Sequence, residues 1–290
     1  MTDQSQDAPS FRQLGPARLL SPVILAVPHA GREYPANLLA ASRLSREKLE
    51  ALEDRHADML VTGAVAAGVT ALVATRARAW IDLNRDEREI DPGMLESPPL
   101  LPLLTSAKVR GGIGLVPRRI ADGGDIWRRR FSQREIDRRI LRDHRPWHQA
   151  IAALLAEARA RFGCAVLIDC HSMPSLPRQS PLLPPQIVVG DRFGRSAADR
   201  FADRLSAVAE AAGLKVARNA PYSGGHTLDR HGRPDQAIHA LQIEIDRALY
   251  LASDLRTPIP DADRVIDLVV RIVAALADEA TSFPQALAAE

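Results

Sequence analysis

Short runs of apolar residues alternate along the chain with longer segments whose apolar residues recur at helical spacing. The runs that we expect to form buried strands are Val23–Val27, Ala71–Ala74, Ala79–Leu83, Ala165–Cys170, Gln186–Val189 and Leu241–Asp246. The segments that we expect to be helical are Ser45–Ala67, Gln133–Phe162, Arg195–Ala212 and Asp263–Ala280. This alternation is typical of an α/β protein with a mixed, mostly parallel sheet sandwiched between helices.

Two proline-rich segments, Pro92–Pro102 and Pro174–Pro185, interrupt this pattern and are expected to be irregular loops. Loops of this length often shape pockets. The chain shows no internal repeat and no linker, so we expect one domain over residues 1–290, with flexible ends at about 1–15 and 282–290.

The charge balance excludes some partners. The chain has 38 basic and 36 acidic residues, a net charge of +2, which argues against nucleic-acid or membrane binding through bulk charge. No apolar run approaches the roughly 18 residues of a membrane span, and the first residues do not resemble a signal peptide. Cys164 and Cys170 are expected on one strand, roughly 20 Å apart and too far for a disulfide. Free thiols fit a cytoplasmic location.

Two histidines directly follow buried apolar runs. His29 comes after Val23–Val27, and His171 after the run that begins at Ala165. Ligands of open α/β sheets bind beyond the carboxyl ends of the strands, and neutral imidazole is a good zinc ligand. The alternative for each histidine is a hydrogen-bonded structural role.

A catalytic zinc needs a third protein ligand. The candidates are Asp54, His56 and Asp58, all within the expected helix Ser45–Ala67. His56 shares the apolar stripe of this helix, which suits a core histidine or a ligand, whereas Asp54 and Asp58 share another face and suit ligands or solvated groups. Periodicity leaves the three open.

The run Leu241–Asp246 alternates polar and apolar residues, which places Gln242, Glu244 and Asp246 on one face of a strand. An edge strand with one solvated face would explain this pattern. A glutamate beside a metal site is also what a general base requires, since it can take a proton from a water and pass it to a leaving amine.

Three further segments carry candidate chemistry. Arg85 follows the expected strand Ala79–Leu83 and can pair bidentately with a substrate carboxylate, or else be a surface arginine paired with Asp82, Asp86 or Glu87. The glycines of Ser223–His226 allow close approach to a ligand, or form a plain turn. The basic run Arg128–Arg130 precedes mixed charges and is interpreted as a solvated helical face.

Short motifs in a fixed order resemble the N-formylglutamate amidohydrolase family and span nearly the whole chain. They are VPHAG at Val27–Gly31, Asp54-x-His56, IDLNR at Ile81–Arg85, GLVPRR at Gly114–Arg119, RPWH at Arg145–His148, IDCHS at Ile168–Ser172, SGGH at Ser223–His226 and HALQIEIDRALY at His239–Tyr250. Each motif is weak alone, but the ordered set is specific.

The resemblance implies a zinc-carboxypeptidase-like fold with a mixed eight-stranded sheet. It implies one Zn²⁺ near His29 and His171, with Asp54 as a helix-borne third ligand. Glu244 would be the general base, and Arg85 would bind the substrate carboxylate or the oxyanion. The pocket would be lined by Asn84, Gly225 and His226, with His56, Arg118 and His148 as further candidates.

The implied reaction is hydrolysis of N-formylglutamate or a similar N-acyl amino acid, with release of formate and glutamate, in histidine degradation. The sequence departs from the family three residues after His226, where the family often has an arginine and this chain has Asp229, followed by Arg230. The alternatives are an amidohydrolase of the same fold for another small amide, and a non-catalytic carboxylate-binding protein.

Overall fold

The computed structural model describes residues 10–99, 101–120, 124–178 and 183–282. The chain forms two compact units, each built from three segments. Unit 1 comprises Met1–Arg12, Pro28–Glu53 and Val73–Ala150, and unit 2 comprises Gln13–Val27, Asp54–Leu72 and Ile151–Glu290. The single domain over residues 1–290 stays a prediction. Of its expected flexible ends, residues 1–9 and 283–290 lie outside the described part of the chain.

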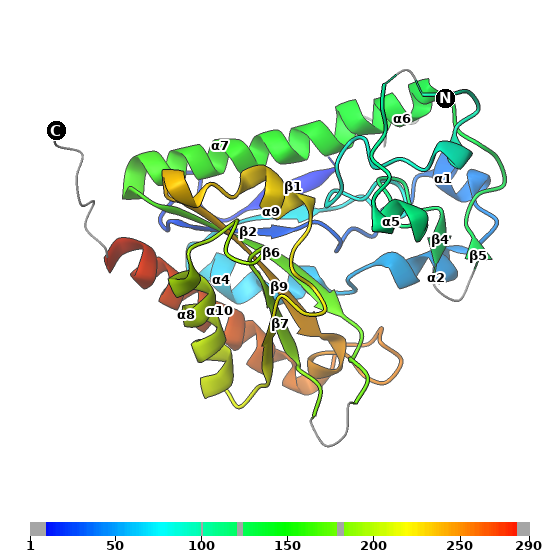
Figure 1. The fold of residues 1–290 in the computed structure, drawn as a ribbon. Coiled ribbons are helices and arrows are strands. Elements are labelled where there is room, and N and C mark those ends of the chain that lie inside the picture. The colour runs from blue at the N-terminus through cyan, green and yellow to red at the C-terminus, as the bar shows by residue number, and fades with distance from the viewer. Residues whose placement is uncertain (1–9, 100, 121–123, 179–182, 283–290) are drawn as a thin grey trace. The chain divides into compact units, whose positions relative to one another are not determined.

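A mixed sheet organises unit 2 (Figure 1). Among the described residues it has seven strands in the order β1-β3-β2-β6-β9-β7-β8, where the resemblance implied eight. β2 pairs with β6, β6 with β9 and β7 with β8 in parallel, whereas β7 and β9 are antiparallel, which confirms a mostly parallel mixed sheet. The strands are β1 (Phe11–Leu14), β2 (Val23–Val27), β3 (Thr70–Ala74), β6 (Ala165–Met173), β7 (Ile187–Gly190), β8 (Val216–Arg218) and β9 (Ile238–Asp246).

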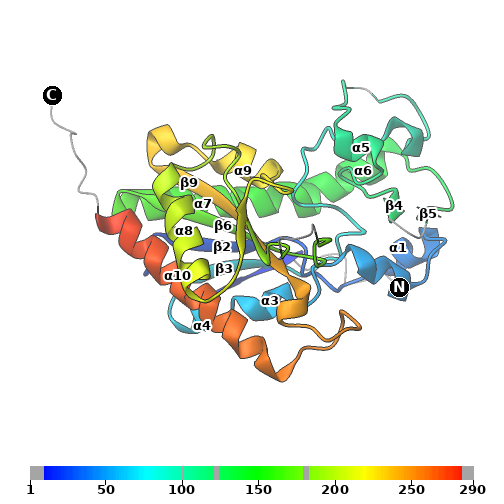
Figure 2. The same cartoon turned by 60° about the horizontal axis from the view of Figure 1, so that its bottom comes forward.

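Helices cover both faces of this sheet. Figures 1 and 2 show α4, α8 and α10 on one face, and α9 with the unit 2 part of α7 on the other. A Cβ added at Gly63 on α4 would lie 2.8 Å from side-chain atoms of Ile266 and Val270, so glycine permits the close approach of α4 and α10. The helical elements are α3 (Ala57–Leu60), α4 (Thr62–Ala66), α7 (Arg145–Phe162), α8 (Asp199–Ala211), α9 (His226–His231) and α10 (Asp263–Ser282), with 3-10 turns at Pro234–Gln236, Arg247–Leu249 and Pro260–Ala262.

The centre of the sheet forms the core of unit 2. Every residue of β2 and β6 is buried, as expected for parallel strands that are covered on both faces. Cys170 lies within β6 and Cys164 directly before it. Both are buried free thiols, which confirms the prediction made from their spacing.

Unit 1 consists mainly of short elements around one long helical run. Its elements are α1 (Ala36–Ala41), α2 (Arg46–Leu49), α5 (Ala107–Arg110), α6 (Gln133–Arg139), the antiparallel pair β4 (Arg119–Ile120) and β5 (Gly124–Asp125), and 3-10 turns at Glu50–Leu52 and Pro92–Met94. A π-helical turn, Ile140–His144, joins α6 to α7. The predicted long helix Gln133–Phe162 is therefore one continuous helical run. It starts at a capping box between Ser132 and Glu135.

Two expected elements are wrong. The segment Ser45–Ala67 is a series of short helical pieces, because the chain leaves the helix at Glu53 and His56 adopts a left-handed backbone with φ 59°. The run Ala79–Leu83 is a buried loop and not a strand, since the amide of Asp82 donates to the carbonyl of Leu115 and that of Trp80 closes a turn on Ala77. The first segment therefore buries its apolar residues in short helical pieces, and the second buries them in a loop.

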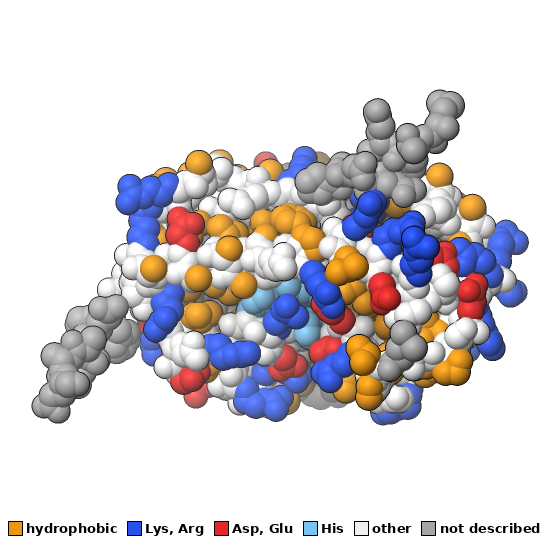
Figure 3. Space-filling model, turned by 90° about the horizontal axis from the view of Figure 1, so that it is seen from above, with side chains coloured by type: hydrophobic (Ala, Val, Ile, Leu, Met, Phe, Trp, Pro, Cys, Tyr) orange, Lys and Arg blue, Asp and Glu red, His pale blue; other side chains and the backbone are white. Residues whose placement is uncertain are grey.

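The remaining predictions concern the two proline-rich segments, membrane-spanning helices and the surface charge. The described parts of Pro92–Pro102 and Pro174–Pro185 are irregular apart from the 3-10 turn Pro92–Met94, and residues 100 and 179–182 lie outside the described residues. Within the described chain, no helix is both long and apolar enough to cross a membrane. Figure 3 shows side chains of both charges interspersed over one face.

Candidate metal and catalytic groups

The pairing of β6 with β9 aligns two predicted site residues of unit 2. His171 on β6 lies opposite Glu244 on β9 in the parallel register. Because β9 lies between β6 and β7, the alternative of an edge strand with a solvated face is wrong. Gln242 donates a hydrogen bond from its amide Nε2 to Glu244 Oε1 at 3.0 Å, which orients the carboxylate.

His171 is held between two carboxylates. Its Nδ1 lies 3.0 Å from Asp54 Oδ2 and its Nε2 lies 2.9 Å from Asp169 Oδ2, and the side chain is almost fully buried. Burial by itself lowers the pKa of His171, but the charge of Asp169, the hydrogen bonds to Asp169 and Asp54, and the charge of Glu244 raise it well above its usual range. The ring therefore sits in a strongly anionic environment that suits a cation.

Asp54 lies in the loop before α3 and not on a helix, which corrects the expected helix-borne carboxylate. Its Oδ2 also accepts a hydrogen bond from the backbone amide of Ser172, and its Oδ1 accepts one from Arg247 Nη2 at 3.1 Å. Of the three candidate third ligands, Asp54 contacts His171 directly. His56 precedes α3 and Asp58 lies in the first turn of that helix.

In unit 1, His29 pairs with Asp82. From the sequence, Asp82 is expected only as a possible surface partner of Arg85. His29 Nε2 lies 2.7 Å from Asp82 Oδ1, and both side chains are almost fully buried. Arg78 and Arg85 approach Asp82 Oδ2 at 2.9 and 3.4 Å. Burial raises the pKa of Asp82, but the two arginines and His29 lower it well below its usual range, so this carboxylate is ionised.

Arg85 is a buried arginine and not the surface residue of the alternative interpretation, since it is only 3% exposed. It donates from Nε to the carbonyl of Ile113 and from Nη1 to that of Asn84. Burial lowers the pKa of Arg85, while Asp82 opposes this effect. The backbone amide of Asn84 donates to Asp82 Oδ1 at 2.9 Å, so both residues are organised around Asp82.

His148 supports this loop from α7. Its Nε2 donates to the carbonyl of Leu83 at 2.9 Å, and His144 Nε2 donates to that of Arg85 at 2.7 Å. His148 is thus placed as a support of the Leu83–Arg85 backbone. Arg118 makes ion pairs with Asp91 at 2.6 Å and Asp125 at 2.9 Å.

The turn before α9 contains the last two predicted pocket residues. Gly225 caps α9 and His226 is its first residue. A Cβ added at Gly190, at the end of β7, would lie 2.7 Å from the carbonyl carbon of Ser223, so the turn packs tightly against β7. At the departure from the family pattern, Asp229 pairs with Arg192 at 2.7 Å, and Arg230 is exposed. The tight packing agrees with a turn, and pocket lining by Gly225 and His226 stays a prediction.

The donor set of these residues suits a divalent ion such as zinc. Imidazole and carboxylate are zinc ligands, and a zinc-binding histidine usually has its second ring nitrogen on a carboxylate. Both histidines show this pattern, His29 with Asp82 and His171 with Asp169. Sequence reasoning missed the roles of Asp82, Asp169 and Arg247, although each lies within a motif that it singled out.

Known proteins resemble this chain over most of its length. Residues 21–251 match the family described as N-formylglutamate amidohydrolase. An N-formylglutamate deformylase of Pseudomonas aeruginosa is 31% identical over 79% of this chain and 82% of its own, and one of Pseudomonas putida is 28% identical over the same shares.

Solved structures agree with this relationship. The crystal structure of N-formylglutamate amidohydrolase from Ralstonia eutropha JMP134 superposes with a TM-score of 0.85 and 32% identity, covering 95% of this chain and 98% of that one. A protein of Agrobacterium tumefaciens shares the fold, with a TM-score of 0.66 and 20% identity, covering 96% and 99% of the two chains. The chain therefore belongs to the N-formylglutamate amidohydrolase family.

Proposed function

We propose that this protein is a zinc-dependent amidohydrolase that cleaves the formyl amide of N-formylglutamate and releases formate and glutamate. The activity is the one named for its deformylase relatives. The observation that supports it best is the alignment of Glu244 with His171 across neighbouring parallel strands, with Asp54 in contact with the same histidine. A candidate base thus adjoins a pair of metal-binding side chains.

We assign the metal ligands as His29, Asp54 and His171. The support is their chemistry, the carboxylate held on each histidine, and the hydrogen bonds that Arg247 and Ser172 donate to Asp54. A bound divalent ion lowers the pKa of water and polarises a carbonyl. Asp82 and Asp169 act as positioning residues, because each fixes the orientation of an imidazole ring.

Glu244 is the general base in this proposal. Its carboxylate takes a proton from the attacking water and then delivers that proton to the departing amine nitrogen. The hydrogen bond from Gln242 Nε2 to Oε1 orients the carboxylate for this proton transfer. Arg85 stabilises the negative charge of the oxyanion or of the substrate carboxylate, and Asn84, Gly225 and His226 contact the substrate.

The test is turnover of N-formylglutamate by the wild-type protein and by Glu244→Gln, which keeps the acceptor for Gln242. We expect formate release to fall by about 10²–10⁴-fold in the variant, with unchanged metal content. Glu210→Gln, at an exposed site on α8, should leave activity unchanged. Undiminished activity in Glu244→Gln would remove the assigned base.

A panel of N-acyl amino acids separates the alternatives. Turnover of another amide, without turnover of N-formylglutamate, would keep the reaction and change the substrate. Binding of carboxylates without any turnover would favour the non-catalytic protein. The role in histidine degradation rests on the family resemblance and the cytoplasmic location on the free thiols, and both stay predictions.

A further inference from the structure

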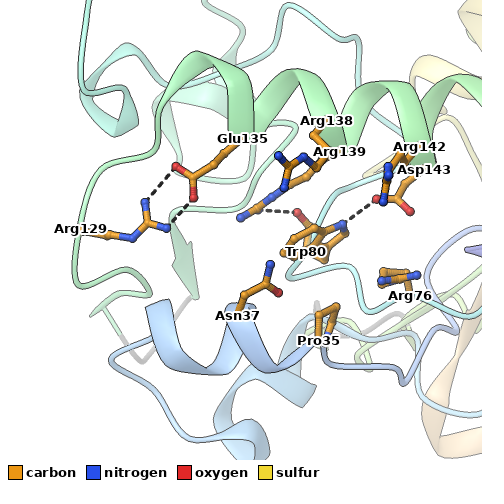
Figure 4. A pocket seen from close by; sticks show the side chains of 10 residues that line it. All are labelled: Pro35, Asn37, Arg76, Trp80, Arg129, Glu135, Arg138, Arg139, Arg142 and Asp143. Atoms are coloured by element: carbon orange, nitrogen blue, oxygen red, sulfur yellow. Dashed lines mark hydrogen bonds and ion pairs between the residues drawn. The ribbon is translucent and has the colours of Figure 1, made fainter. Parts of the chain in front are cut away.

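Unit 1 contains a pocket whose lining is dominated by arginine. Five guanidinium groups, those of Arg76, Arg129, Arg138, Arg139 and Arg142, line about 630 Å³ of space that includes the open solvent at its mouth. Figure 4 shows side chains from α6 and the π-helical turn on one side of this space, with Trp80 hydrogen-bonded to Arg139 and Asp143, and Arg76 on the other side. None of the five arginines belongs to the proposed metal or catalytic groups.

The pocket carries more positive than negative charge. Two carboxylates, Glu135 and Asp143, also line it. Glu135 pairs in a bidentate manner with Arg129 at 2.5 and 3.1 Å, and this hydrogen bonding lowers the pKa of Glu135 to about 2. Asp143 Oδ2 accepts a hydrogen bond from the indole Nε1 of Trp80 at 2.7 Å. Both carboxylates have partners, and the positive charges exceed the negative ones.

Two of the arginines, Arg76 and Arg139, are buried and have an Nε donor without a hydrogen-bond partner among the described residues. Arg76 is 7% exposed and Arg139 is 3% exposed. A buried guanidinium donor without an acceptor is costly, because it has lost water and gained no hydrogen bond.

The surrounding structure fixes these groups in place. The guanidinium of Arg139 stacks on Trp80, with its central carbon 3.9 Å from the ring centroid, and donates from Nη1 to the Trp80 carbonyl at 2.8 Å. Burial lowers the pKa of Arg139 to about 10, although Glu135 and Asp143 act in the opposite direction. The backbone of Arg76 is fixed by close packing, because its carbonyl group lies against Gly31. The guanidinium group of Arg139 and the backbone of Arg76 are therefore held in place at the pocket wall.

We propose that this pocket is a second ligand site that binds the carboxylate or phosphate group of a small molecule. The planar forks of the arginines match either oxyanion bidentately, and the excess of positive charge over negative charge in the pocket attracts an anion. The run Arg128–Arg130 is exposed as expected, but it lies in a bend before α6 and not on a helical face, and Arg129 lines the proposed binding pocket.

The test is titration of the metal-loaded protein with inorganic phosphate and, separately, with succinate, followed by calorimetry and by the intrinsic tryptophan fluorescence, to which Trp80 contributes. The matched pair of variants is Arg138→Gln, which changes the pocket, and Arg134→Gln, at an exposed position on the same helix outside the pocket. We expect one saturable site whose affinity falls by about tenfold in Arg138→Gln and is unchanged in Arg134→Gln.

A second variant examines the buried group. Arg76→Lys keeps the charge but removes the planar fork, so we expect weaker binding with little change in the thermal midpoint. Preference for phosphate over succinate would identify a phosphate ester, and the reverse would identify a carboxylic acid. The proposal is overturned if neither probe saturates, if Arg134→Gln weakens binding as much as Arg138→Gln, or if binding is lost only in Arg85→Gln, which would place the anion at the catalytic groups.

Discussion

At the scale of single residues, the candidate site depends on carboxylates that hold imidazole rings. Asp82 holds His29, and Asp169 holds His171. Asp82 also balances the buried charges of Arg78 and Arg85, so one side chain orients a proposed metal ligand and compensates two cations. Its removal should therefore affect both metal binding and stability.

We predict that Asp82→Asn weakens metal binding by about 10–100-fold, because the His29 ring loses the carboxylate that orients it. The same change leaves two arginines without their buried counter-ion, which should destabilise the fold by about 3–5 kcal/mol. Chelator competition and urea unfolding measure the two effects. Asp86→Asn, at a partly exposed carboxylate of the same loop, should change stability by about 1 kcal/mol or less. Equal behaviour of the two variants would contradict the assigned role of Asp82.

His239 on β9 provides a test of pH dependence that is independent of the site. Its Nδ1 accepts a hydrogen bond from the backbone amide of Ala198, and its ring packs 4.4 Å from that of Phe201. Burial, helped by Arg200, lowers the pKa of His239 to about 4. In the unfolded chain the pKa of His239 is about 6.5. Between about pH 6.5 and pH 4 the unfolded chain therefore binds more protons at His239 than the folded protein does. The free energy of unfolding falls as the pH falls through this window.

The variant His239→Asn retains an acceptor near the position of Nδ1 but cannot titrate. We predict that the wild-type protein loses about 1–2 kcal/mol more stability than this variant between pH 7 and pH 5, after allowance for solvent screening. Urea unfolding at the two pH values measures the difference. Parallel pH dependence of the two proteins would show that His239 does not titrate in this window.

At the scale of elements, the hydrophobic pattern predicted the strands that are buried on both faces. Val23–Val27 is β2 with the same bounds, whereas Ala165–Cys170 omits the last three residues of β6 and Leu241–Asp246 omits the first three of β9. The end of β6 was excluded because His171 and Ser172 do not continue an apolar run. The short strands β1 and β8 were missed, since they are only partly buried.

Where the pattern failed, tertiary contacts determined the backbone. The apolar spacing of Ser45–Ala67 suits a helix, but Glu53 accepts a hydrogen bond from Tyr34, and the carbonyl of Arg55 accepts one from Tyr250. These partners lie far away in the sequence, so no local pattern contains them. The resulting loop is what allows Asp54 to reach His171.

The motif at Val27–Gly31 illustrates a constraint on backbone packing. A Cβ added at Gly31 would lie 2.0 Å from the carbonyl oxygen of Arg76. We predict that Gly31→Ala destabilises the protein by about 1–3 kcal/mol, because the two backbone segments must separate. Gly111→Ala is the control, since its nearest neighbour would be an ordinary contact at 3.4 Å. Thermal unfolding compares the two, and equal midpoints would contradict the close approach.

At the scale of the whole molecule, ordered motifs predicted the family, and the family is shown. Individual roles were harder to predict, because each depends on a partner from a distant segment. Asp54 and His171 are 117 positions apart, and His29 and Asp82 are 53 apart. The sequence identified candidates for each proposed metal ligand, and the fold shows Asp54 in contact with His171.

The arginine pocket shows the same limit. Its residues come from several segments that are separated in sequence, and Arg76 lies just after β3 with no motif around it. The segment after Arg128 contains both basic and acidic residues, as the sequence shows. The sequence does not show that the two carboxylates of this segment, Glu135 and Asp143, have hydrogen-bond partners within the fold. Nor does it show that, among the described residues, the Nε atoms of Arg76 and Arg139 have none.

Metal content and formate release, measured on one sample purified without chelators or a polyhistidine tag, test the proposed metal-dependent reaction most directly. We predict about one zinc per chain. We also predict formate release from N-formylglutamate that a chelator abolishes and added zinc restores. A protein that binds no metal even after zinc is added back, or that releases formate at the same rate with chelator present, would contradict the assigned ligands and the metal-dependent reaction.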